Sequence, residues 1–337
     1  MADLPRVLLI ATGGTISMRI DAQAGGAVPQ LTGRDIVETV PGIEKVARVD
    51  VSEFGRFPGP HMTIERMWEL RAAVLEVMRG AEVDGIVITH GTDTIEETAY
   101  LLDRSLPPEV PVVITGAMRN SSELSWDGPA NLMSAVEVAA HADARGRGTM
   151  VVMDDEIVQG AEVVKTHTEA AGTFRSPNWG PLGITDKNHV LFYRESRRRP
   201  TLAPPAPQPD VDLIKVVAGM TGRLLEASLA SGGHGLVLEA LGRGNVPPAV
   251  VPGIQRWMDA GRPVVVASRS ARGRVLDAYA YAGGGHQLRE MGCIFADHMT
   301  GPQARIELML ALGAHPGAVE RIREVVEAGR YDERGKP

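Results

Sequence analysis

The strongest constraint on the fold is a series of short runs rich in Val and Ile, which alternate along the chain with longer amphipathic stretches. The runs are continuously apolar rather than alternately polar and apolar, the pattern of strands buried on both faces. They lie at residues 7–11, 85–90, 111–115, 149–153, 213–217, 236–238 and 263–268. Helical patterns fall at residues 63–80, 94–103, 129–141, 302–312 and 316–328, the last with Pro316 expected in its first turn. This alternation predicts an α/β fold with mostly parallel sheets covered by helices on both faces.

A proline-rich segment divides the chain. Five of the residues from 200 to 209 are prolines, and proline lacks an amide proton and has a fixed φ, so the segment suits neither a helix nor a central strand. We therefore predict a linker at residues 200–210 between two domains. The larger N-terminal domain covers residues 1–199 and the smaller C-terminal domain covers residues 211–337, each with a mostly parallel sheet flanked by helices.

Composition and charge narrow the class of protein. The 42 acidic residues outnumber the 35 Lys and Arg residues, giving a net charge of −7, so we expect no nucleic-acid and no membrane partner. The single cysteine, Cys293, excludes an intrachain disulfide and a cysteine-based zinc site, and its apolar surroundings predict a buried thiol. The first residues lack a basic stretch followed by a long apolar one, so we expect a cytoplasmic protein.

Three predicted strands are each followed by a short polar or glycine-containing segment. Residues 12–16 (TGGTI) follow the first, residues 90–94 (HGTDT) the second and residues 116–119 (GAMR) the third. Ligands bind at the carboxyl ends of strands in such sheets, so these segments mark one candidate site. Taken alone, residues 12–16 also fit a plain glycine turn with Thr15 as a helix cap. They also fit a phosphate-binding turn, although neither Gly-x-Gly-x-x-Gly nor Gly-x-x-x-x-Gly-Lys is present here.

Two further features each allow a functional and a structural interpretation. Thr92 or Asp93, with Glu96, fits the N-cap and capping box of the following helix. An ionised Asp93 at that helix N-terminus is also suited to hold a substrate ammonium group. Lys165, which follows two valines, fits a strand lysine that extends to solvent or a buried functional cation.

Taken together, these segments resemble the bacterial-type L-asparaginase (asparaginase/glutaminase) family of threonine amidohydrolases. The resemblance extends from residue 7 to about residue 314 and is carried by residues 12–16, 90–94, 114–119 (ITGAMR), 165–167 (KTH) and 174–183 (FRSPNWGPLG). Two separate threonine motifs in this order and at this distance are highly specific.

The resemblance implies an amidohydrolase acting on linear amides without a cofactor or metal, with its catalytic residues in the N-terminal domain. Thr15 would attack the side-chain amide of L-asparagine, ammonia would leave, and water would hydrolyse the acyl-threonine ester. Thr92 and Lys165 would activate the nucleophile, and Asp93 would bind the substrate α-ammonium. A threonine hydroxyl needs an adjacent base, and lysine acts as one near neutrality only when burial or another cation lowers its pKa. The route of the proton therefore stays open.

The resemblance also implies a homotetramer built from close dimers, in which Asn245 of a partner subunit completes the site. This chain departs from the family in substrate recognition. Gly59 and Pro60 stand where the family has a carboxylate-binding Ser-Gln pair, so backbone amides or His61 would have to bind the substrate α-carboxylate. The family's mobile-loop tyrosine has no equivalent within residues 16–30. Amide hydrolysis is thus better supported than a preference for asparagine.

Several alternatives stay open. One alternative is a glutaminase-asparaginase. Glutamine is longer than asparagine by one methylene, and the sequence does not show which of the two the site prefers. An amidohydrolase for another amide such as D-asparagine, or a catalytically weak binding paralogue, would use the same scaffold. The family's subunit for tRNA amidation carries an additional N-terminal region, and a metal hydrolase would need a ligand motif that this sequence lacks. We therefore interpret His90 and His167 as structural or supporting residues.

Overall fold

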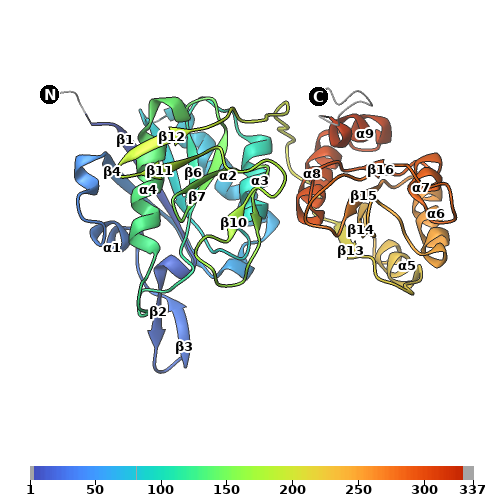
Figure 1. The fold of residues 1–337 in the computed structure, drawn as a ribbon, viewed down its shortest axis with the longest axis horizontal. Coiled ribbons are helices and arrows are strands. Elements are labelled where there is room, and N and C mark those ends of the chain that lie inside the picture. Colours follow the sequence, from blue (N-terminus) through green and yellow to red (C-terminus); the bar gives the residue numbers. More distant parts are fainter. Residues whose placement is uncertain (1–3, 81, 329–337) are drawn as a thin grey trace. The chain divides into compact units, whose positions relative to one another are not determined.

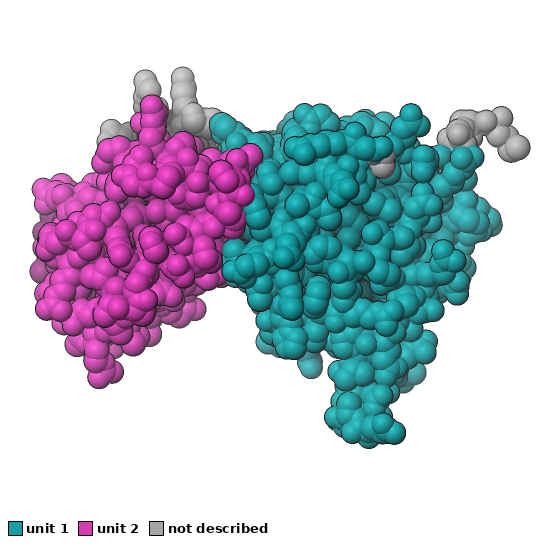
Figure 2. Space-filling model, turned by 180° about the vertical axis from the view of Figure 1, so that it is seen from behind, with its two compact units in different colours: residues 1–201 teal, residues 202–337 magenta. Residues whose placement is uncertain are grey.

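The computed structural model describes residues 4–80 and 82–328. The chain divides into two compact units, residues 1–201 and residues 202–337 (Figure 2). The boundary falls in the proline-rich segment, and residues 200–210, all of them described, form neither helix nor strand. No helix within residues 4–80 and 82–328 is long and apolar enough to cross a membrane.

The described part of unit 1 is built on one eight-stranded sheet, in the order β12-β11-β8-β7-β6-β5-β1-β4 (Figure 1). Its strands are β1 (Arg6–Gly13), β4 (Arg48–Phe57), β5 (Gly85–Thr89), β6 (Val112–Thr115), β7 (Thr149–Met153), β8 (Glu156–Gln159), β11 (Gly183–Asp186) and β12 (His189–Phe192). Five neighbouring strands run parallel, in the spatial order β7-β6-β5-β1-β4. Strand β1 lies between β4 and β5, with Leu9 opposite Val51 and Val87. The predicted α/β class with mostly parallel sheets is confirmed.

The antiparallel part of this sheet, β8, β11 and β12, goes beyond the sequence prediction. Each of these strands is four residues long. Two-residue turns join β7 to β8 (Asp154–Asp155) and β11 to β12 (Lys187–Asn188), and every residue of both turns has a positive φ. Such turns match the twist of antiparallel hairpins, but they usually contain glycine, so the sequence signal is weak here.

Helices cover both faces of the sheet in unit 1. They are α1 (Gly33–Glu38), α2 (Ile64–Gly80), α3 (Ile95–Ser105) and α4 (Gly128–Ala140). Leu132 and Ala135 of α4 share one buried cluster with Val7, Leu9 and Val113 of the strands. Helix α1 accompanies α4, while α2 and α3 lie on the other side of the sheet (Figure 1).

Two small hairpins flank the residues predicted to form the site. The first, β2 (Met18–Asp21) with β3 (Gly26–Pro29), begins directly after residues 15–17 and projects from the body of unit 1 (Figure 1). The Ser121 amide donates to the Met18 carbonyl at 3.1 Å and so ties the base of this hairpin to the segment after β6. The second, β9 (Val164–Lys165) with β10 (Phe174–Arg175), has only two residues in each strand.

The described part of unit 2 has a four-stranded parallel sheet, β13 (Val211–Lys215), β14 (Gly235–Ala240), β15 (Val264–Ser268) and β16 (Ile294–Phe295). Its helices are α5 (Arg223–Ala230), α6 (Val251–Asp259), α7 (Gly285–Glu290), α8 (Gly301–Ala314) and α9 (Val319–Glu327). Trp257 of α6 is fully buried and donates to the Leu225 carbonyl at 2.9 Å. Cys293 is buried as predicted, and burial raises the pKa of its thiol to about 12.

One predicted helix boundary is wrong. The pattern at residues 316–328 places Pro316 in the first turn of a helix, but α9 begins at Val319. Pro316 and Gly317 instead form the turn after α8, and Gly317 has a φ of 75°. A left-handed residue ends a helix rather than starting one, so the new helix begins beyond it.

Replacing Leu9 by Ala is expected to lower the free energy of unfolding by about 2–5 kcal/mol, because this fully buried side chain would leave a cavity in the centre of the sheet. Leu191 of edge strand β12 is 43 % exposed and serves as the matched control, with a loss below about 1 kcal/mol for Leu191→Ala. Equilibrium urea unfolding measures both values. Equal losses would contradict the placement of the core.

Candidate active site

Three loops at the carboxyl edge of the unit 1 sheet pack backbone against backbone through glycines. Gly14 follows β1 with a φ of 82°, Gly91 follows β5, and Gly59 begins the turn after β4. A Cβ atom on Gly14 would lie 2.5 Å from the Gly91 Cα atom, and one on Gly91 would lie 2.5 Å from the Gly59 Cα atom. A side chain on Gly14 or on Gly91 would therefore prevent the loops from coming this close.

Thr15 is presented by the first of these loops. The Gly14 amide donates to the Phe57 carbonyl at 2.9 Å, and the Gly14 carbonyl accepts from both the amide and the hydroxyl of Ser17 at 3.0 and 2.8 Å. Ile16 is fully buried, while Thr15 itself is half-buried. The loop is therefore fixed on both sides of Thr15. Its hydroxyl makes no hydrogen bond to any residue within 4–80 or 82–328.

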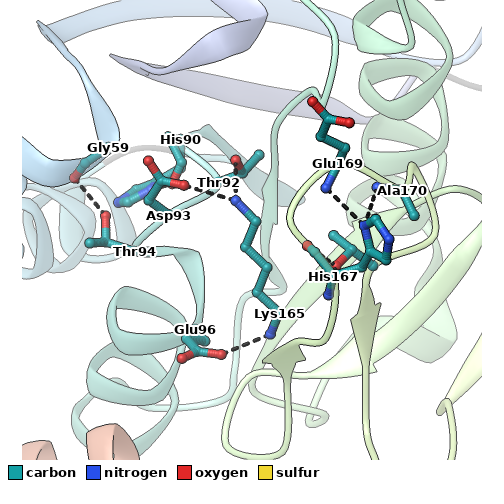
Figure 3. A network of polar contacts seen from close by, with 12 residues as sticks. Gly59, His90, Thr92, Asp93, Thr94, Glu96, Lys165, His167, Glu169 and Ala170 are labelled. Carbon is teal, nitrogen blue, oxygen red and sulfur yellow. Dashed lines mark hydrogen bonds and ion pairs between the residues drawn. The ribbon is translucent and has the colours of Figure 1, made fainter.

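Thr92, Asp93 and Lys165 form one group of polar contacts, here called the lysine group (Figure 3). The Lys165 Nζ atom donates to Thr92 Oγ1 at 3.0 Å and to Asp93 Oδ1 at 2.8 Å. The Lys165 side chain is 17 % exposed, whereas that of Asp93 is 58 % exposed. The interpretation of Lys165 as a lysine extended to solvent is therefore wrong, because its ammonium group turns inward to these two partners.

The capping interpretation of the same loop is also wrong. Helix α3 takes Thr94 as its N-cap, not Thr92 or Asp93. The Thr94 hydroxyl donates to the Gly59 carbonyl at 2.9 Å, and the Glu96 carboxylate accepts the Lys165 amide at 2.8 Å. The side chains of Thr94 and Glu96 therefore bind distant parts of the chain and do not form a local capping box. Sequence reasoning misses this role of Glu96, because it depends on a residue 69 positions away.

His90 supports the loop that carries Thr92. Its Nδ1 atom lies 2.9 Å from the Gly91 carbonyl, which can only accept, so Nδ1 donates. The Nε2 atom then accepts from the Thr98 hydroxyl of α3 at 2.9 Å. The ring is fully buried, and this burial lowers the pKa of His90 to about 4, so it is neutral at pH 7. His90 therefore ties the loop to α3 as a neutral side chain.

Three more predicted site residues, Gly59, Pro60 and His61, lie together in the turn after β4. Gly59 is buried, and a Cβ atom there would lie 3.3 Å from Asp93 Oδ2, so this carboxylate oxygen faces the glycine. Pro60 and His61 are exposed, and the His61 carbonyl accepts from the Arg66 guanidinium. Asn245 lies in unit 2 after β14.

The Asn245 side chain is held by its own unit. Its Oδ1 atom accepts from the Gly285 amide at 3.2 Å, at the start of α7. Its backbone pairs with that of Leu241, with N–O distances of 2.8 and 2.9 Å. The loop that bears Asn245 is therefore fixed within unit 2.

These features define an α/β protein with a polar group at the carboxyl edge of its larger sheet, where enzymes of this class bind their ligands. Residues 6–198 match the family described as "Asparaginase, N-terminal", and residues 210–326 match the "Glutaminase/Asparaginase C-terminal domain". The chain is 39 % identical to a probable L-asparaginase of Deinococcus radiodurans, over 95 % of this chain and 98 % of that protein. It is 33 % identical to an L-asparaginase of Bacillus licheniformis, over 94 % and 98 %.

A solved structure agrees with the sequence relatives. A probable cytoplasmic L-asparaginase from Campylobacter jejuni superimposes with a TM-score of 0.84 at 30 % identity, covering 96 % of this chain and 99 % of that one. The chain therefore belongs to the asparaginase family, and it is a hydrolase of the L-asparaginase type. The resemblance found in the sequence motifs is confirmed.

Acid is expected to destabilise the protein through His90. The pKa of this side chain is about 4 in the folded chain, against 6.5 for an unperturbed imidazole, so between these values the unfolded chain binds a proton that the folded chain excludes. The free energy of unfolding should thus fall by about 3 kcal/mol as pH decreases from 6.5 to 4, with no further loss from this group below pH 4.

Urea unfolding at pH 7 and pH 4 measures this contribution. His90→Gln removes the buried imidazole, so the variant should lose less stability than wild type over the same interval. His234→Gln, at an exposed position, is the matched control and should keep the wild-type pH dependence. An identical pH dependence in wild type and His90→Gln would contradict the assignment.

Proposed function

We propose that the chain hydrolyses L-asparagine to L-aspartate and ammonia through an acyl-threonine intermediate on Thr15. The observation that carries this proposal is the double contact of the Lys165 ammonium with Thr92 Oγ1 and Asp93 Oδ1, at 3.0 and 2.8 Å. The glycine packing of Gly14 on Gly91 supports it, because it brings the loop of Thr15 against the loop of Thr92.

In the proposed reaction, Thr15 Oγ1 attacks the carbonyl carbon of the side-chain amide. The hydroxyl proton passes to Thr92 Oγ1 while Thr92 gives its own proton to Lys165, which enters this step as the neutral amine. The same proton then passes from Lys165 through Thr92 to the leaving nitrogen as the C–N bond breaks. Ammonia departs and leaves an ester on Thr15. A water molecule then hydrolyses this ester and regenerates the hydroxyl.

Asp93 is proposed to bind the α-ammonium of the substrate. Its side chain is 58 % exposed, and its Oδ2 atom faces Gly59 while Oδ1 binds Lys165. An α-ammonium at Oδ2 would place the α-carboxylate beside Gly59 and Pro60. Since these residues offer no side-chain donor there, backbone amides or the His61 ring would bind the carboxylate.

The second candidate is a glutaminase-asparaginase, or an amidohydrolase for another amide such as D-asparagine. The absence of a side chain at Gly59 favours this alternative, because the carboxylate end of the site is bounded by backbone. One additional methylene changes discrimination by only about 1–3 kcal/mol, so both amino acids fit such a site. A catalytically weak binding paralogue is the outcome expected if no amide is hydrolysed.

The assembly and location are proposed on the family resemblance. We propose an N-terminal catalytic domain at residues 1–199, a linker at 200–210 and a C-terminal domain at 211–337; the family matches at 6–198 and 210–326 support this division. We further propose a homotetramer of close dimers, with Asn245 reaching the site of the partner subunit, and a cytoplasmic location, as the name of the Campylobacter jejuni relative suggests for that protein.

Thr15→Ala is expected to lower kcat for ammonia release from L-asparagine by at least about 10³-fold, because the variant lacks the nucleophile. Release from L-asparagine, L-glutamine and D-asparagine is measured with the purified full chain. L-Asparagine turnover that vanishes in the variant supports the proposal. Equal activity of Thr15→Ala and wild type would refute the threonine mechanism.

Lys165→Met is expected to lower kcat by about 10²–10⁴-fold, the usual contribution of a group that moves a proton in the transition state. Methionine keeps much of the length of the side chain but removes its charge and its hydrogen bonds to Thr92 and Asp93. Lys45→Met, at an exposed position, is the matched control and should keep wild-type activity. Both variants are measured by ammonia release from L-asparagine. Wild-type activity in Lys165→Met would show that Lys165 has no part in the proposed mechanism.

A further inference from the structure

Lys165 stands on a short and weakly supported piece of backbone. Strand β9 has two residues, and in it Lys165 pairs only with Phe174 of β10. The segment that joins these strands is largely exposed, with residues 166–170 all on the surface. A two-residue ladder of this kind does not by itself hold a side chain to the accuracy that catalysis requires.

A carboxylate from another element holds the main chain of Lys165. Glu96 lies in the first turn of α3, and its Oε2 atom accepts the Lys165 amide at 2.8 Å (Figure 3). A hydrogen bond from an amide to an ionised carboxylate is stronger than one between neutral groups. Because α3 follows the Thr92–Asp93 loop directly, this bond ties Lys165 to the element that carries both of its side-chain partners.

An imidazole holds the loop that follows Lys165. The Nδ1 atom of His167 accepts the amides of Glu169 and Ala170, both at 3.0 Å (Figure 3). The two His167 backbone groups bind the Thr173 hydroxyl, which accepts from the amide and donates to the carbonyl, both at 2.7 Å. These bonds join His167, two residues after Lys165, to Thr173, so the chain turns back and continues into Phe174 of β10.

We infer that Glu96 and His167 are positioning residues, which fix the main chain at Lys165 and just after it and so hold its ammonium group against Thr92 and Asp93. Neither residue touches the reacting atoms. Glu96 acts on the amide of Lys165 itself, and His167 acts on the turn that sets the course of β9 and β10. This inference rests on the proposed function of Lys165.

The test uses two pairs of variants in the full chain. Glu96→Ala and His167→Ala remove the acceptors, and each should lower kcat for L-asparagine by about 10–100-fold, the loss that a misplacement of about 1 Å can cause, with a much smaller change in KM. Glu96→Gln keeps an oxygen acceptor, and His167→Asn replaces the acceptor nitrogen of the imidazole by an amide oxygen. Asparagine accepts backbone amides two residues on in Asx turns, so His167→Asn should restore most of the activity.

Amide hydrogen exchange provides a readout that does not depend on activity. His167→Ala should accelerate exchange of the Glu169 and Ala170 amides, and Glu96→Ala that of the Lys165 amide. Thr168→Ala, in the same exposed loop, is the matched control and should change neither exchange at these amides nor kcat. Circular dichroism checks that each variant is folded. If an Ala variant does not fold, the Gln and Asn variants still allow the test.

The outcomes separate this inference from the proposed function. If wild type hydrolyses none of the tested amides, the proposed function fails while the exchange rates still decide whether Glu96 and His167 fix this stretch of main chain. Unchanged exchange in both Ala variants overturns the inference. So does faster exchange with unchanged kcat, and so does a loss of kcat in the Gln and Asn variants as large as in the Ala variants.

Discussion

The arrangement of the site depends on the contact of three glycine backbones, at Gly14, Gly91 and Gly59. Each ends or follows a different strand, and the Cβ atoms that they lack would lie within 2.5 Å of the neighbouring backbone in two of these contacts. The hydroxyl of Thr94 and the carbonyl of Phe57 then join the same loops by hydrogen bonds. The threonines lie at one edge of the sheet because no side chains separate the loops that bear them.

Much of the fold follows from the sequence because buried parallel strands leave a strong signal. The runs at β1, β5, β6 and β7 are apolar without interruption, since helices cover both of their faces. The strands β11 and β12 alternate in burial and are joined at Lys187–Asn188, a turn without glycine. At four residues each, they are too short for this alternation to predict a strand from the sequence. Their place in the sheet is set by the pairing of β11 with β8, which no local pattern encodes, and β12 then pairs with β11.

The members of the site are easier to predict than their contacts. Motifs single out Thr15, Thr92, Asp93 and Lys165, and the last three form one bonded group. Capping rules assign Glu96 the wrong role, because they consider only the next few residues. Its true partner, the amide of Lys165, comes from a segment 69 positions further along the chain. Asn245 belongs to unit 2, so its part in the site stays a prediction.

The glycine contacts also have a consequence for protein engineering. The three loops fit one another in series, since Gly91 occupies the space beside Gly14 where a side chain would lie, and Gly59 occupies the corresponding space beside Gly91. A loop transplanted singly into another sheet would meet ordinary side chains and would not adopt this course. The three loops therefore form a single transferable unit, and the smallest graft of the site comprises the ends of β1, β4 and β5 together with β9, which bears Lys165.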